Sequence, residues 1–509
     1  MSAANGLDEM LGRLVRPDRP DAPALLHPAG RVAFTRGALA ERVRACAAAF
    51  ERAGIARGEA VAFGIRQDAA GIAWLLGAFR AGVVVVVLDP GLALGILADR
   101  CRAAGVVATV MDGGVATIAH HGLLRRIAAW RGLVLPDPRT LAAAAWATSP
   151  ALGRIPRLDR LAHGDAHRPL EPDGAAIAIF TSGTTGAPRA VVHTPNSLAE
   201  TLRQAAALVE LGPADRVLGT GLHLVGPALL AGAAVVVPPA GTDAATLARV
   251  TRATATTHAS LPLHRAIAWA GAGGASRALR HVLLGSAPVR NAGLRTLADA
   301  LPGVRVASAY GMTEHLLIAT VGLEERLDHD ERTGDLVGLP LPGVRVRIAD
   351  DGETWVSGPA LARGYLGDAA PAAELPTGDV ASFDARGRLV LRGRRKEMLI
   401  RAGENIYPAL YEAPLADAAG IAAAVMVGVE APDGDERVAL FAVPGAGMTT
   451  AAALARLEAV LRRADAPIDR HARPDLVLAV EGLPRTGRSG KPDRAALAAI
   501  AAAQLAGGR

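Results

Sequence analysis

A run of glycine and hydroxyl side chains occupies residues 181–189, directly after an apolar segment at 175–180. It reads Thr-Ser-Gly-Thr-Thr-Gly-Ala-Pro-Arg. Glycines let backbone N–H groups face an anion, and the hydroxyls add further donors. A polyphosphate needs that density of donors, and the run lacks the GxxxxGK[ST] pattern of a P-loop. We therefore predict a polyphosphate-binding turn here rather than an ordinary polar turn.

Lysine is almost absent from the chain. Only Lys396 and Lys491 occur, so nearly all of the 55 basic residues are arginine. Arginine serves wherever a fixed, fork-shaped cation is enough. The two lysines are therefore candidates for tasks that need a compact and mobile ammonium group.

Together with later motifs, the turn resembles the superfamily of acyl-CoA synthetases, luciferases and non-ribosomal peptide adenylation domains. The family loop reads TSG[ST]TGxPK, and Arg189 stands here at its last position. Arginine also binds phosphate, so we expect weakened rather than lost function. The later motifs are Tyr310-Gly311-Met312-Thr313-Glu314, Thr377-Gly378-Asp379, Gly393-Arg394-Arg395-Lys396-Glu397, Gly403-Glu404-Asn405-Ile406-Tyr407-Pro408 and the segment 483–491.

The resemblance implies an ATP site and a role for each residue in it. The phosphates would contact Thr181, Ser182, Gly183, Thr184, Thr185, Gly186 and Arg189, the adenine would contact Gly285, Ser286, Ala287, Tyr310 and Gly311, and the ribose would contact Asp379 and Arg394. Thr313 would touch the α-phosphate and Glu314 would hold Mg²⁺. These residue types suit their roles, because a carboxylate binds a hard cation or accepts from a diol.

The resemblance also implies a moving C-terminal part. Lys396 falls on the family's hinge position, and Lys491 falls on its catalytic lysine, which bridges the substrate carboxylate and the α-phosphate. Gly403 and Glu404 belong to a loop that, in the family, swings in for thioester formation. Ala402 replaces the first glycine of that loop, a small change that should leave the swing intact.

Two histidines lie close to these motifs. His223 follows Thr220-Gly221-Leu222, where relatives often place a residue that gates the acyl site, and we count it among the candidate catalytic residues. A histidine in an apolar stretch can also be a hydrogen-bonded core residue, so this alternative stays open. His193 follows the turn at 181–189, and its role is likewise open between structure and function.

Charge and cysteine content restrict the partners. The formal net charge is +6, but the basic residues are scattered, so we expect no nucleic-acid partner. Cys46 and Cys101 stand far apart, which argues against a disulfide scaffold or a thiolate zinc site and fits a reducing cytoplasm. We expect neither a signal peptide nor a transmembrane segment. The sequence does not indicate an oligomeric state.

The elements that position these residues alternate between helix and strand, which predicts an α/β fold with a mainly parallel sheet. We predict helices at 41–53, 71–81 and 449–464 and at the C-terminal end, and strands at 60–63, 83–88, 175–180, 235–237, 281–284, 304–309, 344–348, 422–429, 438–443 and 476–480. Segment 222–237 reads as a buried helix and strand. Segment 150–174 carries four prolines without a period and reads as a surface connection.

The pattern also predicts the domains. Residues 1–393 would form a large ATP- and acyl-binding domain with a β-rich subdomain at about 334–393. Residues 394–509 would form a small, mobile α+β domain that turns about residue 396.

Together these features predict an AMP-forming acid–thiol ligase that uses ATP and Mg²⁺. It would convert a carboxylic acid, most simply a fatty or other aliphatic acid, to acyl-AMP and pass the acyl group to coenzyme A. Three alternatives stay open. The acyl group could go to the phosphopantetheine of a carrier protein acting in trans, it could close to a β-lactone, or the chain could be a non-catalytic nucleotide-binding relative.

Overall fold

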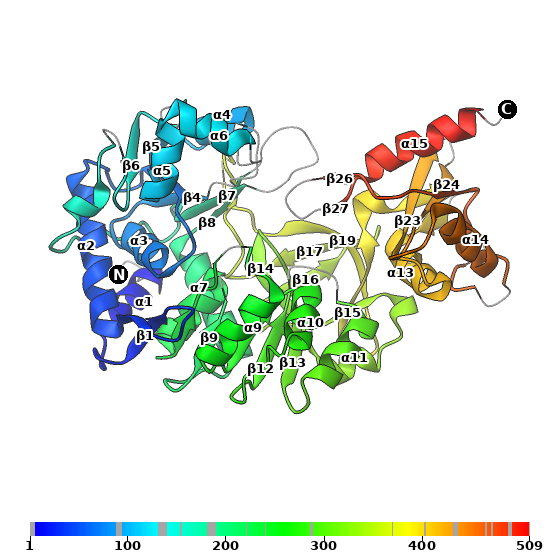
Figure 1. The fold of residues 1–509 in the computed structure, drawn as a ribbon, viewed down its shortest axis with the longest axis horizontal. Coiled ribbons are helices and arrows are strands. Elements are labelled where there is room, and N and C mark those ends of the chain that lie inside the picture. The colour runs from blue at the N-terminus through cyan, green and yellow to red at the C-terminus, as the bar shows by residue number, and fades with distance from the viewer. Residues whose placement is uncertain are drawn as a thin grey trace. The chain divides into compact units, whose positions relative to one another are not determined.

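The structure is a computed structural model that describes residues 6–87, 94–130, 140–152, 155–180, 190–219, 221–239, 241–285, 289–368, 370–401, 404–430, 436–463, 466–469, 472–486 and 491–507. The chain divides into two compact units. Unit 1 comprises residues 1–323, 340–345 and 356–375, and unit 2 comprises residues 324–339, 346–355 and 376–509. Figure 1 traces both in chain order.

The first sheet of unit 1 has the strand order β18-β8-β7-β4-β3-β5-β6. The strands from β7 to β6 run parallel, while β8 and β18 continue the edge antiparallel. Their bounds are β3 Ala60–Gly64, β4 Val84–Val87, β5 Val106–Met111, β6 Ala144–Ala147, β7 Ile177–Phe180, β8 Ala190–His193 and β18 Gly364–Tyr365. The valine run of β4 is buried over three of its four residues, as expected of a strand that is covered on both faces.

The second sheet of unit 1 has the order β14-β13-β12-β11-β9-β10-β1-β2. Its strands run parallel from β13 to β1, with antiparallel edges at β14 and β2. The bounds are β1 Pro23–Leu26, β2 Val32–Thr35, β9 Arg216–Leu218, β10 Ala234–Val236, β11 His258–Leu261, β12 His281–Leu284, β13 Arg305–Met312 and β14 His315–Gly322. The predicted α/β class with mainly parallel strands is confirmed in both sheets.

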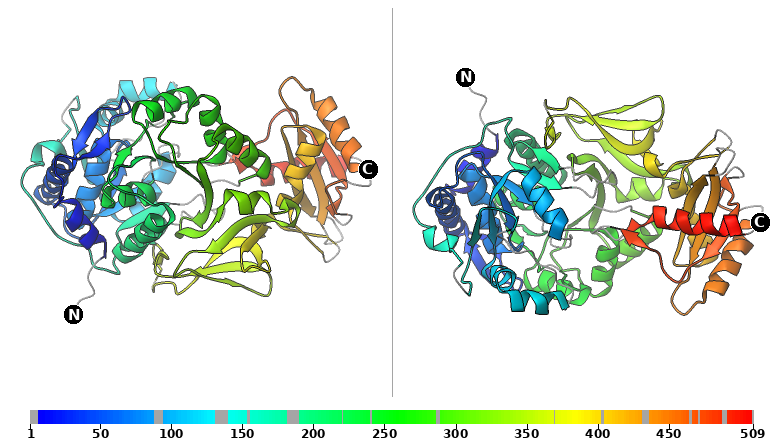
Figure 2. Two further views of the ribbon diagram at one scale, coloured as in Figure 1. Left: turned by 90° about the horizontal axis from the view of Figure 1, so that it is seen from below. Right: turned by 90° about the horizontal axis from the view of Figure 1, so that it is seen from above.

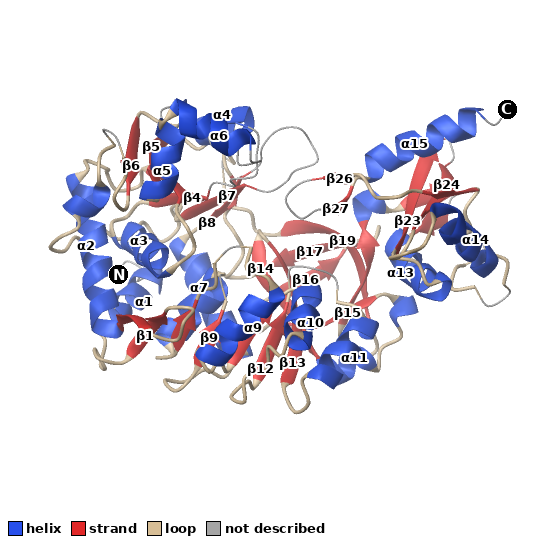
Figure 3. Cartoon of the chain, viewed as in Figure 1, coloured by secondary structure: helices blue, strands red, loops and turns tan. Residues whose placement is uncertain are grey.

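Helices flank the sheets of unit 1, as Figures 1 and 3 show. Their bounds are α1 Gly6–Leu14, α2 Arg36–Arg52, α3 Ala69–Arg80, α4 Leu94–Ala103, α5 Gly113–His120, α6 Gly122–Trp130, α7 Pro195–Leu208, α8 Leu222–Leu230, α9 Ala244–Ala253, α10 Leu263–Gly271 and α11 Asn291–Ala300. Helix α2 begins before the predicted Glu41, because the Thr35 side chain accepts from the Ala38 N–H and caps it there. The predicted buried helix and strand within 222–237 are α8 and β10.

The largest core of unit 1 packs α2 and α3 against β3 and β4. Small side chains dominate it, and the rings of Phe50 and Trp74 meet edge to face at 5.7 Å. The prediction of a surface connection at 150–174 is wrong in part, because a short 3₁₀ helix at Leu158–Leu161 packs on α2. Leu158 is fully buried there, since its side chain joins the same core.

Unit 2 contains a sheet of order β16-β17-β19-β20-β15, the hairpin β21-β22, a second sheet of order β23-β24-β25 and the short pair β26-β27. The strand bounds are β15 Asp335–Pro340, β16 Arg345–Ile348, β17 Glu353–Ser357, β19 Leu375–Phe383, β20 Leu389–Arg394, β21 Leu399–Arg401, β22 Glu404–Ile406, β23 Ala423–Glu430, β24 Glu436–Val443, β25 Leu476–Ala479, β26 Arg485–Thr486 and β27 Lys491–Pro492. The helices are α12 Leu323–Leu327, α13 Pro408–Ala419, α14 Thr450–Leu461 and α15 Arg494–Gly507, with 3₁₀ turns at Glu331–Thr333 and Arg395–Glu397.

Alternate residues of β23 and β24 point to opposite faces of their sheet. Met426 and Leu440 pack against α13 and α14, whereas Val427 and Phe441 pack against α15. Figures 2 and 3 show the helices on both sides of these strands. The tail of the chain therefore forms a three-layer arrangement with a separate core on each face of the sheet.

Candidate active site

The polyphosphate-binding turn predicted at 181–189 lies outside the described residues, but the two strands that flank it are described. Strands β7 and β8 pair antiparallel, with Phe180 opposite Ala190. The segment therefore connects two neighbouring strands at one end of a hairpin. Ser286 and Ala287 are also outside the described residues. Gly285 follows β12, and a Cβ there would lie 3.7 Å from the Ala309 carbonyl, so steric contact does not require this glycine.

Tyr310 and Gly311 lie on β13, and the chain reverses at Thr313 and Glu314 before β14. A Cβ on Gly311 would lie 2.1 Å from the carbonyl oxygen of Leu316, so this position needs a glycine. Tyr310 and Gly311, predicted at the adenine, and Thr313, predicted at the α-phosphate, thus lie on one tight strand reversal.

Three hydrogen bonds hold this reversal, which we call the Thr313–Glu314 turn. The His193 Nε2–H donates to the Thr313 carbonyl oxygen at 2.7 Å. The Ala362 N–H donates to the Glu314 carbonyl oxygen at 2.8 Å. The Tyr365 hydroxyl donates to Glu314 Oε1 at 2.9 Å. The backbone and the carboxylate of the turn are therefore held separately.

His193 is fully buried at the end of β8. Burial lowers its pKa, because a charged imidazole loses solvation there. Its Nδ1 lies 3.3 Å from the Ser197 hydroxyl, and Nε2 must carry the proton because a carbonyl can only accept. His193, whose role the sequence left open, is therefore a neutral donor that fixes the backbone of the turn.

Glu314 offers a fitting group for a hard cation. Its Oε1 takes the tyrosine hydroxyl, and no other side chain of the described residues hydrogen-bonds to its carboxylate. No group of three or more acidic, histidine or cysteine side chains gathers in the described parts of the chain. A Mg²⁺ site with one protein carboxylate is consistent with this, since Mg²⁺ beside phosphates keeps water and phosphate ligands.

Asp379 and Arg394, the two residues predicted at the ribose, face each other on β19 and β20. The Arg394 Nε lies 2.8 Å from Asp379 Oδ1, and another guanidinium nitrogen donates to the Thr377 carbonyl oxygen at 3.1 Å. Asp379 is buried, whereas Arg394 is exposed. The motif Thr377-Gly378-Asp379 thus lies within a strand, and Gly378 supplies its left-handed φ of 71°.

The predicted hinge residue Lys396 lies in the 3₁₀ turn Arg395–Glu397, and its side chain is outside the described set. Ion pairs hold both neighbours of the lysine. Arg395 contacts Asp351 and Glu353, each at 2.8 Å.

On the other side of the hinge residue, Arg494 Nε lies 3.3 Å from Glu397. Arg494 also binds Glu412 on α13 at 2.6 Å and donates to the Met426 carbonyl oxygen on β23 at 2.7 Å.

Lys491 begins β27 and is exposed. It pairs with Thr486 through the backbone. Gly403 lies outside the described residues, while the backbone of Glu404 pairs with Arg401 in the β21-β22 hairpin. Lys491, Glu404, Asp379 and Arg394 belong to unit 2, whereas Tyr310, Thr313, Glu314 and His223 belong to unit 1.

His223 lies in the first turn of α8 and is partly buried. Its imidazole folds back over Gly221, where a Cβ would lie 2.3 Å from the ring. Burial lowers the pKa of His223, so the neutral ring is favoured. A neutral, partly exposed imidazole can pack against an apolar ligand.

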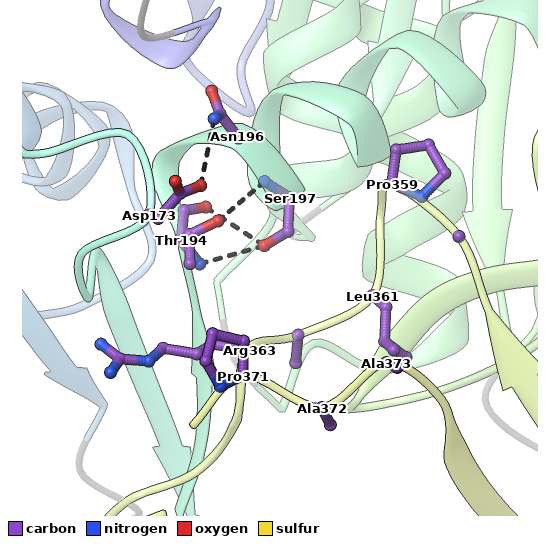
Figure 4. Close-up of a pocket in the computed structure, with 12 residues that line it drawn as sticks. Asp173, Thr194, Asn196, Ser197, Pro359, Leu361, Arg363, Pro371, Ala372 and Ala373 are labelled. Atoms are coloured by element: carbon purple, nitrogen blue, oxygen red, sulfur yellow. Dashed lines mark hydrogen bonds between the residues drawn. The ribbon is translucent and has the colours of Figure 1, made fainter. Parts of the chain in front are cut away.

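A pocket of about 200 Å³ lies elsewhere in unit 1, between the start of α7 and segment 358–363. Figure 4 shows Asn196 turned toward Asp173, with Thr194 and Ser197 capping the helix. None of the predicted site residues lines it. Its wall includes Ala362, whose N–H donates to the Glu314 carbonyl oxygen of the Thr313–Glu314 turn.

The sequence missed Tyr365. Tyr365 lies outside the family motifs, and Arg363-Gly364-Tyr365 carries no chemical signature of its own. Only the pairing of β18 with β8 brings its hydroxyl to Glu314.

No helix in the described part of the chain is long and apolar enough to span a membrane.

Residues 16–366 match the family of AMP-binding enzymes. Phenyloxazoline synthase MbtB of Mycobacterium sp. (strain MCS) is 30% identical over 94% of this chain, which spans only 41% of that protein. Sulfoacetate–CoA ligase of Cupriavidus necator is 30% identical over 83% of this chain and 85% of the ligase. The solved structure of amide bond synthetase McbA from Marinactinospora thermotolerans is 25% identical, with a TM-score of 0.80 over 97% of this chain and 99% of that one.

These similarities confirm the predicted superfamily and its fold. The three relatives differ in the products that their names state, so they do not define the acid or the acceptor. The chain belongs to the family of AMP-binding enzymes.

Proposed function

We propose that this chain activates a carboxylic acid with ATP, forms an acyl-AMP and transfers the acyl group to a thiol, with coenzyme A as the first choice. The observation that carries the proposal is the Thr313–Glu314 turn. It presents a carboxylate with one open oxygen on a backbone that β8 holds, and β8 begins where the hydroxyl-rich segment 181–189 ends.

A free carboxylate is a poor electrophile, and attack of its oxygen on the α-phosphorus of ATP gives a mixed anhydride and pyrophosphate. Negative charge grows on the phosphates during this step, so catalysis needs positioned donors and cations rather than a protein nucleophile. Thr313, segment 181–189 and Lys491 would supply donors. Mg²⁺ held by Glu314 would neutralise phosphate charge. Asp379 and Arg394 would hold the ribose, and Tyr310 would stack on the adenine.

Lys491 would reach this site by rotation of the C-terminal part about Lys396. The ion pairs around the hinge support this proposal, because Arg395 binds Asp351 and Glu353 before it, and Glu397 binds Arg494 after it. The residue between these anchors is the one left to absorb a change in backbone angle. The proposed domains are therefore residues 1–393, with the subdomain at about 334–393, and residues 394–509.

The intact segment 403–408 supports a thiol acceptor in a second half-reaction, in which Gly403 and Glu404 would line the thiol path. Carrier-bound phosphopantetheine in trans is the first alternative acceptor. The likeness to an amide bond synthetase favours an amine as a further alternative. Closure of a 3-hydroxy acid to a β-lactone would use the same acyl-AMP.

For the acid, we propose an aliphatic carboxylate before an aryl acid. Segment 221–228 offers small and apolar residues and no acidic partner for an amino group. Within this segment, the α8 residues Leu224, Val225 and Ala228 are buried. His223 would gate the acyl chain at the start of this helix.

Lys491→Ala tests the central assignment. We expect this variant to lose acid-dependent ATP–pyrophosphate exchange by on the order of 10²–10³-fold, because it removes a cation that acts on the developing charge. It should keep most of its thiolysis of supplied acyl-AMP, since the second half-reaction would use segment 403–408 instead. Normal exchange in this variant would refute the assignment.

The substrate follows from a panel of carboxylic acids read by pyrophosphate release in the wild type. Consumption of free coenzyme A, of a carrier-protein thiol or of an amine then identifies the acceptor. Absence of pyrophosphate release with every acid, together with normal ATP binding, would favour a non-catalytic nucleotide-binding protein.

A further inference from the structure

Glu314 is held differently at its backbone and at its side chain. His193 and Ala362 fix the carbonyl groups of the Thr313–Glu314 turn, but they leave the rotation of the glutamate side chain free. Among the described residues, only Tyr365 restricts it, through the 2.9 Å hydrogen bond to Oε1. One oxygen of the carboxylate thereby accepts from a neutral donor, and the other has no hydrogen bond from the described side chains.

Tyr365 is itself fixed to the strand that follows the proposed polyphosphate turn. It stands opposite Val191 in the antiparallel β18-β8 pair. The next residue, Leu366, donates its N–H to the Ala190 carbonyl oxygen at 2.8 Å. The Tyr365 N–H donates to Asp368 Oδ2 at 2.7 Å. Position 364 needs glycine, since its φ is 136°.

We propose that Tyr365 is a positioning residue that aims the open oxygen of Glu314 at the cation accompanying ATP. The inference rests on the proposed function and extends it to a residue outside the motifs of the chain. A neutral hydroxyl suits this task, because it orients the carboxylate without cancelling the charge that binds the cation. An arginine or a lysine at the same place would compete with the cation for that charge.

The hydroxyl acts through Glu314 and not on the substrate. Partners that orient a metal-binding carboxylate typically change metal affinity or activity by about 10–100-fold when they are removed. The loss should therefore fall on the cation requirement rather than on the acid or the adenine.

Tyr365→Phe tests the inference, since it removes the hydroxyl and keeps the ring. We expect the Mg²⁺ concentration for half-maximal ATP–pyrophosphate exchange to rise about 10-fold or more, while the KM for the acid stays close to that of the wild type. A second readout needs no turnover. Binding of Mn²⁺ in the presence of ATP and without acid, followed by electron paramagnetic resonance, should weaken by a similar factor.

Tyr411→Phe is the matched control. Its hydroxyl also donates to a carboxylate, Asp469, at 2.7 Å, but it lies in unit 2 on α13. This variant measures what the loss of a tyrosine–carboxylate hydrogen bond does to stability alone. The Mn²⁺ titration should remain at the wild-type value in Tyr411→Phe.

A double-mutant cycle completes the test. In Glu314→Gln the further change Tyr365→Phe should have little effect on Mn²⁺ binding, because the hydroxyl has no charged oxygen left to orient. Equal effects of Tyr365→Phe in the two backgrounds would overturn the inference, as would a wild-type Mn²⁺ titration in Tyr365→Phe. If the wild type binds Mn²⁺ and ATP but activates no acid, the proposed function fails while the titration still decides the role of Tyr365.

Discussion

Two of the predicted site carboxylates, Glu314 in unit 1 and Asp379 in unit 2, are held in opposite ways. Glu314 receives one hydrogen bond from a neutral hydroxyl and is partly exposed. Asp379 is buried and pairs with the guanidinium of Arg394 at 2.8 Å. One carboxylate keeps its charge available, whereas the charge of the other is already matched within the protein.

This difference indicates which group each carboxylate is suited to bind. A divalent cation is attracted by negative charge. A carboxylate that is already paired with arginine would therefore bind the cation poorly. Hydroxyl groups of a sugar need acceptor lone pairs, and an aspartate in an ion pair still has them. The surroundings of the two residues therefore match the cation and ribose roles that we propose.

Glu314→Gln should produce the largest effect, because it removes the charge and keeps the shape. We expect acid-dependent ATP–pyrophosphate exchange to fall by on the order of 10²–10³-fold. Part of the loss should be recovered by raising Mg²⁺, which a stopped assay at increasing Mg²⁺ would show. A variant with wild-type exchange at low Mg²⁺ would contradict the cation role.

Low pH should destabilise unit 1 more than unit 2. Of the described histidines, those with a lowered pKa all lie in unit 1, and burial together with His258 and Arg305 lowers the pKa of His281 to about 4. The folded state then binds fewer protons than the unfolded chain. The contribution is complete above pH 6.5, the ordinary value, and is lost as the pH falls toward 4.

For His281 alone this amounts to up to about 3 kcal/mol of the free energy of unfolding. Denaturant unfolding of the full chain between pH 4 and 7 should show unit 1 losing stability first. His281→Leu should reduce this dependence, and the four other histidines with a lowered pKa should keep the remainder. A pH dependence that is the same in His281→Leu and in the wild type would argue against this origin.

Asp379→Asn should produce a smaller effect of another kind. The amide keeps one oxygen for Arg394 but loses an acceptor for the ribose, so we expect the KM for ATP to rise about 10-fold, as for the loss of one hydrogen bond to a charged group. The Mg²⁺ requirement should not change. If it rises as far as in Glu314→Gln, the division of roles between the two carboxylates is incorrect.

The sequence indicated the candidate residues because their motifs are continuous in the chain. The strand at 281–284 was predicted with its observed bounds, since a short valine and leucine run that ends at a glycine is typical of a buried strand. The 3₁₀ helix at 158–161 was missed, because prolines hid a leucine that only the tertiary core explains.

The holding of the Thr313–Glu314 turn could not be predicted either. His193, Ala362 and Tyr365 are distant from it in the chain, and strand pairing alone brings them together. The sequence thus indicated candidate groups for the chemistry but not the groups that hold them.

Arg494 follows Lys491 closely and ties the start of α15 to α13, β23 and the end of the hinge turn. If the C-terminal part turns about residue 396, as we propose, Lys491 moves together with Arg494 and the elements that Arg494 binds. The path of the ammonium group would then be set by the geometry of the whole C-terminal part. The lysine side chain would adjust only the last few ångströms of that path. A substitution that removes the contacts of Arg494 would then make the final position of Lys491 less well defined, although neither lysine is changed.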